Sequence, residues 1–180
     1  MNDEDVVTLI IARTRSSRLP GKIFLTIRPG INILEQTIIQ VKEGFNGKTA
    51  LLYDENGPEY IAKIISDEYK IDFYSGNENP TKRIIKYLKG LKRLPKFFIR
   101  VTADNPLISI EALMKLNEFA KLNRNQKIID YISLPNLIPG TKPEMFSIRS
   151  LFKIEEICLK NNLEIGEHLT LYYLLNKKLF

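Results

Sequence analysis

Cations and hydroxyl groups are concentrated in one short segment near the N-terminus. The segment runs from Ala12 to Lys22 and reads A-R-T-R-S-S-R-L-P-G-K, with three arginines, one lysine and two serines. Guanidinium groups bind phosphate oxygens through paired hydrogen bonds, and hydroxyl groups add further donors. This composition predicts a binding site for a polyphosphate. The alternative interpretation is a solvated basic turn, in which Pro20-Gly21 only reverses the chain.

An apolar run immediately precedes this segment. Val6 to Ile11 reads V-V-T-L-I-I, which predicts a buried strand. Open α/β sheets bind their ligands beyond the carboxyl ends of the strands, so the basic segment lies where such sheets place a ligand. It is not a generic phosphate loop, because neither G-x-x-x-x-G-K-S/T nor G-x-G-x-x-G occurs in the 180 residues.

A carboxylate follows a second apolar strand. Asp104 comes shortly after the expected strand Phe97–Val101, so it lies at the same edge of a parallel sheet as the basic segment. A carboxylate in that place can hold a Mg²⁺ ion that also contacts a bound polyphosphate. The alternative is a turn in which the aspartate stabilises the bend at Asn105-Pro106.

Strand-like and helix-like patterns alternate along the chain with short connections. The expected strands are Val6–Ala12, Thr49–Tyr53, Ile71–Tyr74, Phe97–Val101, Ile128–Ile132 and Met145–Ile148. Apolar residues at helical spacing predict a helix after each of the first four strands and two more after the last. Asn32, with Glu35 three residues later, predicts a capping box, and Ser109 predicts an N-cap. The helix expected after Thr49–Tyr53 should have an apolar face that includes Ile64, and the last expected helix should have one that includes Leu175.

The alternating order predicts the fold class. Strands separated by helices favour a three-layer α/β/α sandwich around a mostly parallel sheet. A chain of 180 residues that is 44% hydrophobic has enough material for one core, so we expect a single domain over residues 1–180. The stretch from Pro135 to Pro143 is irregular and is expected to form a loop over the site.

Composition narrows the class of protein. No apolar stretch approaches the length of a membrane span, the N-terminus is not a basic signal sequence, and Cys158 has no second cysteine to pair with. We therefore expect a soluble, cytoplasmic protein with no membrane partner. The net charge of +6 is compatible with a nucleic-acid binder. No nucleic-acid motif accompanies the charge, so we expect no nucleic-acid partner.

The basic segment resembles the signature loop of the cytidylyltransferases that activate sugars for surface glycans. The likeness is strongest to the spore coat polysaccharide biosynthesis type, a relative of the acylneuraminate and ketodeoxyoctonate cytidylyltransferases. In that type the loop reads roughly Q-A-R-x-x-S-S/T-R-L-P-G-K, and here Ile11 replaces the glutamine. Further segments resemble the family in the same order: Leu34-Glu35, Tyr74-Ser75-Gly76 with Arg83, Arg100 to Ile108, Asp130 to Ser133, and Glu167 to Thr170.

The resemblance implies a fold and a reaction. The fold is that of the nucleotide-diphospho-sugar transferases, also described as GT-A-like. In the reaction, the hydroxyl group of a sugar or sugar acid attacks the α-phosphate of CTP, giving a CMP-sugar and pyrophosphate. The cofactor implied is Mg²⁺. Family members often dimerise, so the resemblance is also compatible with a homodimer.

The resemblance also implies roles for particular residues. Arg13 and Lys22 would embrace the triphosphate as the catalytic cations, with Lys22 near the α-phosphate, and Asp104 would hold the metal. Arg83 would lie near the nucleotide; the alternative is a solvent-facing helix arginine. The remaining nucleotide-binding residues implied are Ala12, Ser16, Ser17, Arg18 and Gly21.

The sugar side departs from the family. Where the family usually has P-D-G-L-D-V-E-V-F, this chain reads P-G-T-K-P-E-M-F, so Lys142 stands in place of an expected aspartate. An ammonium group cannot bind a metal. Either Lys142 contacts a phosphate or a sugar carboxylate, or the chain binds nucleotide or a partner protein without turnover. Glu144 and His168 are further sugar-side candidates, although a histidine at a helix start also serves as a capping or packing residue.

Overall fold

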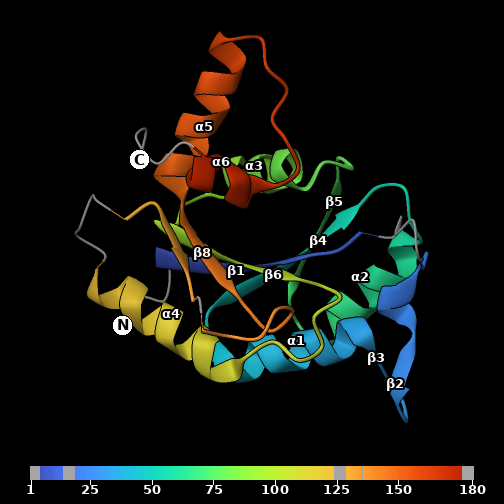
Figure 1. The fold of residues 1–180 in the computed structure, drawn as a ribbon. Coiled ribbons are helices and arrows are strands. Elements are labelled where there is room, and N and C mark those ends of the chain that lie inside the picture. Colours follow the sequence, from blue (N-terminus) through green and yellow to red (C-terminus); the bar gives the residue numbers. More distant parts are fainter. Residues whose placement is uncertain (1–4, 14–18, 124–128, 135, 176–180) are drawn as a thin grey trace.

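The computed structural model describes residues 5–13, 19–123, 129–134 and 136–175. These residues form three layers, with a central sheet between two groups of helices (Figure 1). Helices α1 (Ile33–Gly44), α2 (Glu59–Glu68) and α4 (Ile110–Leu122) cover one face of the sheet. Helices α3 (Pro80–Lys89), α5 (Ile148–Lys160) and α6 (Leu169–Leu175) cover the other. The predicted three-layer α/β/α sandwich is confirmed.

The central sheet contains six strands in the order β5-β4-β1-β6-β8-β7. Their bounds are β1 (Val6–Ile11), β4 (Lys48–Asp54), β5 (Asp72–Gly76), β6 (Phe97–Thr102), β7 (Tyr131–Ser133) and β8 (Glu144–Ser147). Neighbouring strands from β5 to β6 are parallel, whereas β8 is antiparallel to both β6 and β7. Ile11 at the end of β1 lies opposite Leu52 of β4 and Thr102 of β6. The loops that follow these three strands therefore begin side by side.

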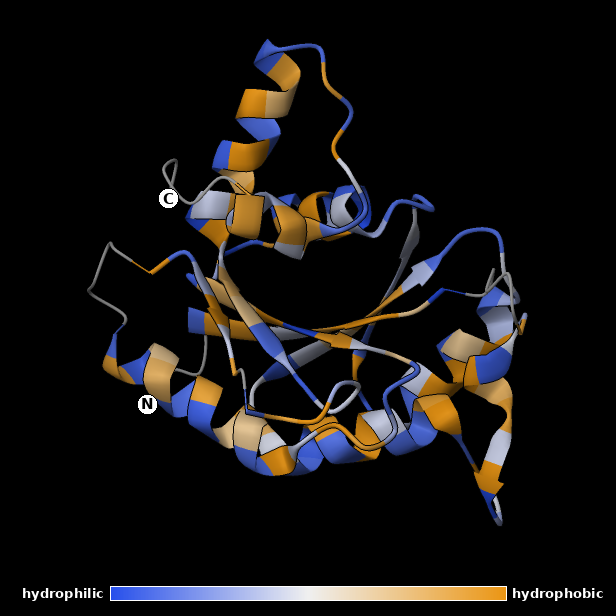
Figure 2. Ribbon diagram, viewed as in Figure 1, coloured by the Kyte–Doolittle hydropathy of each residue, from blue (hydrophilic) through white to orange (hydrophobic). Residues whose placement is uncertain are grey.

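The central strand β1 is buried along its whole length. Val7, Leu9 and Ile11 belong to the core beneath α3, α5 and α6, while Val6 and Ile10 belong to the core above α1, α2 and α4. Helices lie on both faces of the sheet, so successive side chains are apolar in either direction. Figure 2, which is coloured by hydropathy, shows hydrophobic residues in orange along the middle of the sheet.

Two helix starts match the sequence predictions. The Asn32 side chain accepts a hydrogen bond of 2.9 Å from the Glu35 amide, and the Glu35 carboxylate accepts one of 2.8 Å from the Asn32 amide. This reciprocal pair is the predicted capping box at the start of α1. The Ser109 hydroxyl accepts a hydrogen bond from the Ala112 amide and caps α4, as predicted.

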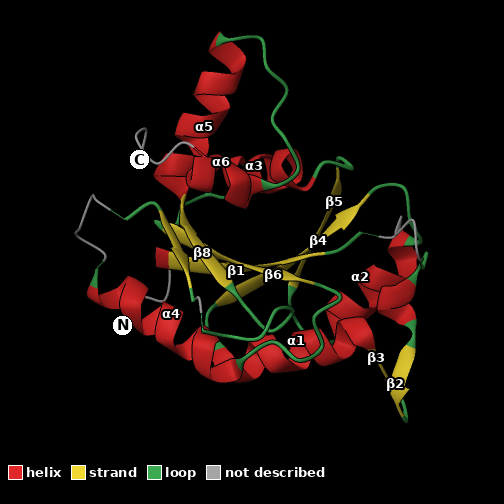
Figure 3. Ribbon diagram, viewed as in Figure 1, coloured by secondary structure: helices red, strands yellow, loops and turns green. Residues whose placement is uncertain are grey.

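The structure also departs from the predictions. A two-stranded hairpin, β2 (Thr26–Arg28) and β3 (Ile31–Asn32), projects from the body and was not predicted (Figure 3). The strand expected over Ile128–Ile132 begins at Tyr131, and Ile128 lies outside the described residues. Ile64 and Leu175 are exposed, so both expected core positions are wrong. The buried stripe of α2 instead runs through Ala62, Ile65 and Ser66.

No helix in the described ranges is both long enough and apolar enough to span a membrane.

Candidate functional site

The strand order places the loops after β1 and β6 side by side at the carboxyl edge of the sheet. From β1 the chain passes to β4 and β5 on one side, and then returns through α3 to β6 on the other side of β1. The strand order therefore changes direction between β1 and β6, and we call this place the switch point. Open α/β sheets bind ligands outside the carboxyl ends of their strands. Two backbone hydrogen bonds fix the loops there: Ala12 donates to Leu52 (3.0 Å) and Ala103 donates to Ile11 (2.9 Å).

Lys22 and Asp104 meet at this switch point. The Lys22 ammonium forms an ion pair with the Asp104 carboxylate, and about one third of each side chain is exposed. Lys22 opens a short 3-10 helix, Lys22–Phe24, and Gly21 just before it has a φ of +69°. This left-handed conformation favours glycine, so the Pro20-Gly21 turn is what directs Lys22 toward the end of β6.

The surroundings of Asp104 keep its carboxyl group ionised. Burial alone would raise the pKa of Asp104. The hydrogen bond and charge of Lys22, together with a hydrogen bond from Thr102, outweigh burial and hold this pKa below its ordinary value. The carboxylate is therefore ionised and partly exposed, and a metal ion would bind it in competition with Lys22.

The donor set at Asp104 fits a magnesium ion that is shared with a substrate. Across the described residues no group of three or more His, Cys, Asp or Glu side chains could hold a metal by itself. Mg²⁺ commonly takes one or two protein carboxylates and completes its shell with water and phosphate oxygens. Asp104 offers one such carboxylate at the switch point, which suits a metal that arrives with a triphosphate.

Helix α1 supports the loop that carries Asp104. The Thr37 hydroxyl is completely buried and lies 3.1 Å from the carbonyl oxygen of Ala103 and 2.9 Å from that of Ile33. Gln40, one turn further along α1, lies 3.5 Å from the Pro106 carbonyl. These contacts link the capped helix to the residues on either side of Asp104, and so fix the position of the carboxylate.

Arg13 is the second residue after β1, and its side chain reaches the segment just before α6. Its guanidinium lies 2.9 Å from the Glu167 carboxylate, and both side chains are nearly half exposed. The pair brings the segment Glu167 to Thr170 next to the basic loop, although the two are separated by most of the chain. Ser16, Ser17 and Arg18 lie outside the described residues. Ala12 is buried, and its carbonyl oxygen faces Arg83.

Arg83 does not face solvent, so the alternative of a solvent-facing helix arginine is wrong. Its side chain is completely buried. It donates hydrogen bonds to the carbonyl oxygens of Asn77 (2.8 Å) and Ala12 (2.9 Å). Burial lowers the pKa of the guanidinium to about 10, although the nearby Asp54 carboxylate opposes this shift. The group is therefore still charged at neutral pH.

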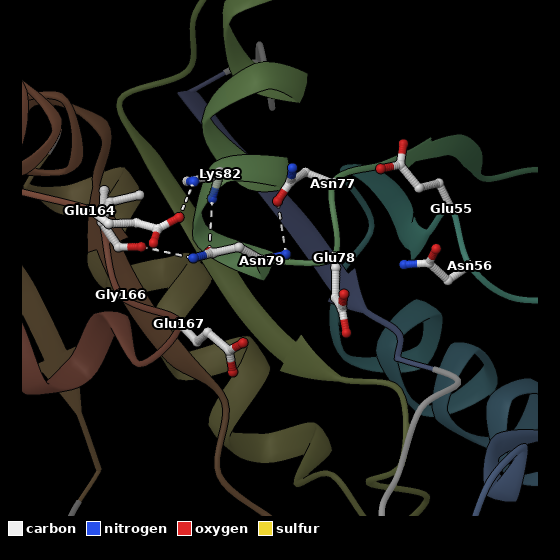
Figure 4. A pocket seen from close by; sticks show the side chains of 10 residues that line it. Glu55, Asn56, Asn77, Glu78, Asn79, Lys82, Glu164, Gly166 and Glu167 are labelled. Atoms are coloured by element: carbon white, nitrogen blue, oxygen red, sulfur yellow. Dashed lines mark hydrogen bonds and ion pairs between the residues drawn. The ribbon is translucent and has the colours of Figure 1, made fainter.

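A cleft of 540 Å³ adjoins these residues at the ends of β4 and β5. Figure 4 shows the side chains from three segments that converge on it. Its lining comprises Glu55, Asn56, Asn77, Glu78, Asn79, Lys82, Glu164, Ile165, Gly166 and Glu167. Asn79 donates to the Ile165 carbonyl (2.7 Å) and Lys82 pairs with Glu164 (2.5 Å), which ties the far wall to α3.

Of these lining residues, the sequence pointed only to Glu167, as part of the segment Glu167 to Thr170 that resembles the family. The polar run Asn77-Glu78-Asn79 follows an expected strand, as Asp104 does, and this position at a strand end was the available signal. The rest of the far wall, Glu164 to Gly166, lies distant in the sequence and gives no comparable signal.

The three sugar-side candidates lie in different surroundings. The Glu144 carboxylate pairs with Arg100 and accepts hydrogen bonds from Tyr131 (2.8 Å) and Thr170 (2.9 Å), so its oxygens are engaged. Lys142 lies in the turn before β8, next to Thr141, whose carbonyl accepts a hydrogen bond of 2.9 Å from Ser109. His168 is exposed just before α6, beside Glu167.

Comparison with known proteins gives the family context. No family model matches the chain. The spore coat polysaccharide biosynthesis protein SpsF of Bacillus subtilis is 26% identical over 174 residues, which cover 93% of this chain and 69% of that protein. The 3-deoxy-manno-octulosonate cytidylyltransferase of Rhizobium etli is 29% identical over 115 residues, which cover 62% of this chain and 45% of that protein.

A solved structure shows the same fold. A cytidylyltransferase from Leptospira borgpetersenii matches with a TM-score of 0.81 and 24% identity, over 98% of this chain and 73% of that one. The predicted resemblance to the cytidylyltransferases is confirmed. The nucleotidyltransferase fold that the resemblance implied is the fold observed.

The structure brings together part of the residue set that the cytidylyltransferase resemblance implied. Lys22 and Asp104 are in contact, and Arg13 leaves the adjoining strand end. Arg83 is buried against the carbonyl oxygen of Ala12 and does not face solvent. The individual roles of these residues remain predictions.

Proposed function

We propose that this protein transfers a cytidylyl group from CTP to a hydroxyl group of a sugar or sugar acid, with release of pyrophosphate. The observation that carries the proposal is the contact between Lys22 and Asp104 at the switch point between β1 and β6. The contact supports the proposal because an ammonium group can bind phosphate and a carboxylate can bind a metal, and both lie at the carboxyl edge where open α/β sheets bind ligands. The similarity to cytidylyltransferases supports CTP as the nucleotide.

The proposed reaction needs alignment and charge stabilisation more than covalent chemistry. The sugar hydroxyl oxygen attacks the α-phosphorus and releases its proton to solvent, while the bond from that phosphorus to the bridging oxygen of the β-phosphate breaks and pyrophosphate leaves. Negative charge develops on the phosphate oxygens in the transition state. Lys22, the first residue of the short helix after Gly21, would stabilise that charge at the α-phosphate. Mg²⁺ held by Asp104 would neutralise further charge on the triphosphate.

Arg13 would bind the triphosphate after leaving Glu167. The Arg13–Glu167 pair is largely exposed, and exposed ion pairs contribute only about 0–1 kcal/mol. A triphosphate offers the guanidinium several charged oxygens in place of one carboxylate. We therefore expect the Arg13 side chain to turn toward the nucleotide on binding. Glu167 and His168 would then border the acceptor side of the site.

We include residues 1–180 in one nucleotidyltransferase-like domain. The second candidate is a relative that binds CTP or a partner protein without turnover, and the observation that favours it is Lys142, two residues before β8. A cytoplasmic location and a homodimer remain predictions.

Pyrophosphate release separates the two candidates. The assay contains the purified protein, CTP, Mg²⁺ and 3-deoxy-manno-octulosonate, the acceptor named for the Rhizobium etli relative. An active transferase releases pyrophosphate with the acceptor and much less without it. Stabilisation by CTP without release from any of a panel of sugar acids would instead favour the non-catalytic relative. In that case Lys142→Asp is the variant to test for a gain of metal-dependent release.

A further inference from the structure

Arg83 is the largest side chain that the described structure buries completely. Burying a guanidinium is costly unless its donors are satisfied, because the charged form loses its hydration. Two of its nitrogens have partners, and both partners are backbone carbonyl oxygens at strand ends. Its Nε atom is also buried and has no hydrogen-bond partner. A side chain held in this way is unlike a surface ligand for phosphate.

The two carbonyl oxygens belong to strands that are not neighbours. Ala12 follows β1 and Asn77 follows β5, while β4 lies between these strands in the sheet. The guanidinium therefore bridges the carboxyl ends across β4. The buried Asp54, the last residue of β4, attracts the same guanidinium. One planar group thus joins the ends of two parallel strands by hydrogen bonds and is attracted by the charge at the end of the strand between them.

The bridge ends one residue before Arg13. Ala12 is held from both sides, since its amide donates to Leu52 and its carbonyl oxygen accepts from Arg83. The direction in which the chain leaves β1, and with it the starting point of the basic loop, depends on this residue. Arg13 also lies close enough for its charge to act on Arg83.

We propose that Arg83 is a positioning residue, which fixes the carboxyl end of β1 so that Arg13 meets the nucleotide in the binding geometry. It acts through Ala12 and does not touch the nucleotide. The part of this proposal that concerns nucleotide affinity rests on the proposed function, whereas the part that concerns the strand end stands by itself.

The first test measures the strand end in the free protein. Arg83→Met keeps an unbranched apolar stem and removes the donors, and Arg83→Lys keeps the charge with a shorter reach. Amide hydrogen exchange at Ala12 is expected to become at least about tenfold faster in Arg83→Met and to change less in Arg83→Lys. Lys86→Met, an exposed position on the same helix, is the control. Unchanged exchange at Ala12 in both Arg83 variants would overturn the proposal.

The second test asks whether Arg83 acts through Arg13. CTP affinity is measured for Arg13→Ala, Arg83→Met and the double variant. If Arg83 only positions the loop, each single variant loses roughly tenfold and the double variant loses little more than Arg13→Ala alone. Losses that multiply to about a hundredfold would show that Arg83 contacts the nucleotide itself, contrary to the proposal.

The two tests fail in distinguishable ways. A wild-type protein that binds no CTP contradicts the proposed function, and the exchange at Ala12 then still decides the role of Arg83. If Arg83→Met does not fold, the same two measurements on Arg83→Lys are expected to show smaller changes in the same directions. Arg83→Lys with wild-type exchange at Ala12 would contradict the proposal.

Discussion

Single residues at strand ends carry most of the chemistry proposed for this protein. Lys22 and Asp104 were each predicted from a polar residue that follows a buried strand, and the structure places them in contact. The burial of Arg83 could not be predicted in the same way. Its helix also carries Lys82, Lys86 and Lys89, so the sequence did not show which basic residue faces the core. Which of these basic side chains is buried depends on how α3 packs against the sheet.

Replacing Lys22 tests the charge at the α-phosphate. Lys22→Ala is expected to lower turnover about 10²–10³-fold, as the loss of one preorganised electrostatic group does in other active sites. The free energy of unfolding should fall by no more than about 1 kcal/mol, the contribution expected from the partly exposed Lys22–Asp104 ion pair. Pyrophosphate release measures the effect, and Lys63→Ala on the exposed side of α2 is the matched control. Full activity in Lys22→Ala would exclude Lys22 from the reaction.

The lowered pKa of Asp104 makes its contribution to stability depend on pH. The folded-state pKa lies below the unfolded value of about 3.9, so the ionised group stabilises the fold above that value. This stabilisation disappears as the pH falls through the folded-state pKa. Asp104→Asn should therefore be less stable than wild type at neutral pH, by about 1 kcal/mol, with a difference that shrinks toward pH 3. Urea unfolding across this range measures it, and a difference independent of pH would argue against an ionised, stabilised Asp104.

At the scale of elements, local signals predicted which segments form helices and strands. The capping box of α1 and the cap of α4 were predicted from residue identity, because they depend on contacts three residues apart. The β2–β3 hairpin was missed because its strands are short and β2 is exposed, so they show no alternating pattern. The antiparallel direction of β8 relative to β7 could have been predicted from the sequence. No helical pattern separates these two strands, and parallel neighbours need a long crossover connection.

The cap of α1 offers a test at this scale. Asn32→Ala removes the acceptor for the Glu35 amide and should lower the free energy of unfolding by about 1 kcal/mol. Since α1 also holds the Ala103 carbonyl through Thr37, the affinity for CTP should fall slightly as well. Asn46→Ala, at an exposed position after the same helix, is the control for urea unfolding. Equal stabilities of the two variants would show that the capping box contributes nothing.

At the scale of the whole molecule, the sequence predicted the layers but not the strand order. Continuous apolar strands indicate helices on both faces, which the two cores confirm. The order β5-β4-β1-β6 depends on which strands pair across long crossovers, and no single segment encodes it. That order puts the ends of β1 and β6 next to each other and so brings Lys22 and Asp104 into contact. The far wall, Glu164 to Glu167, likewise comes from tertiary packing alone.

The most direct test of the central claim is the melting temperature with each of the four ribonucleoside triphosphates, with and without Mg²⁺. A ligand that binds only the folded state raises the melting temperature in proportion to its binding free energy. The account predicts the largest rise with CTP, a further rise with Mg²⁺, and a reduced shift in Lys22→Ala but not in Lys63→Ala. No rise with any triphosphate, or an undiminished shift in Lys22→Ala, would contradict a nucleotide site between β1 and β6.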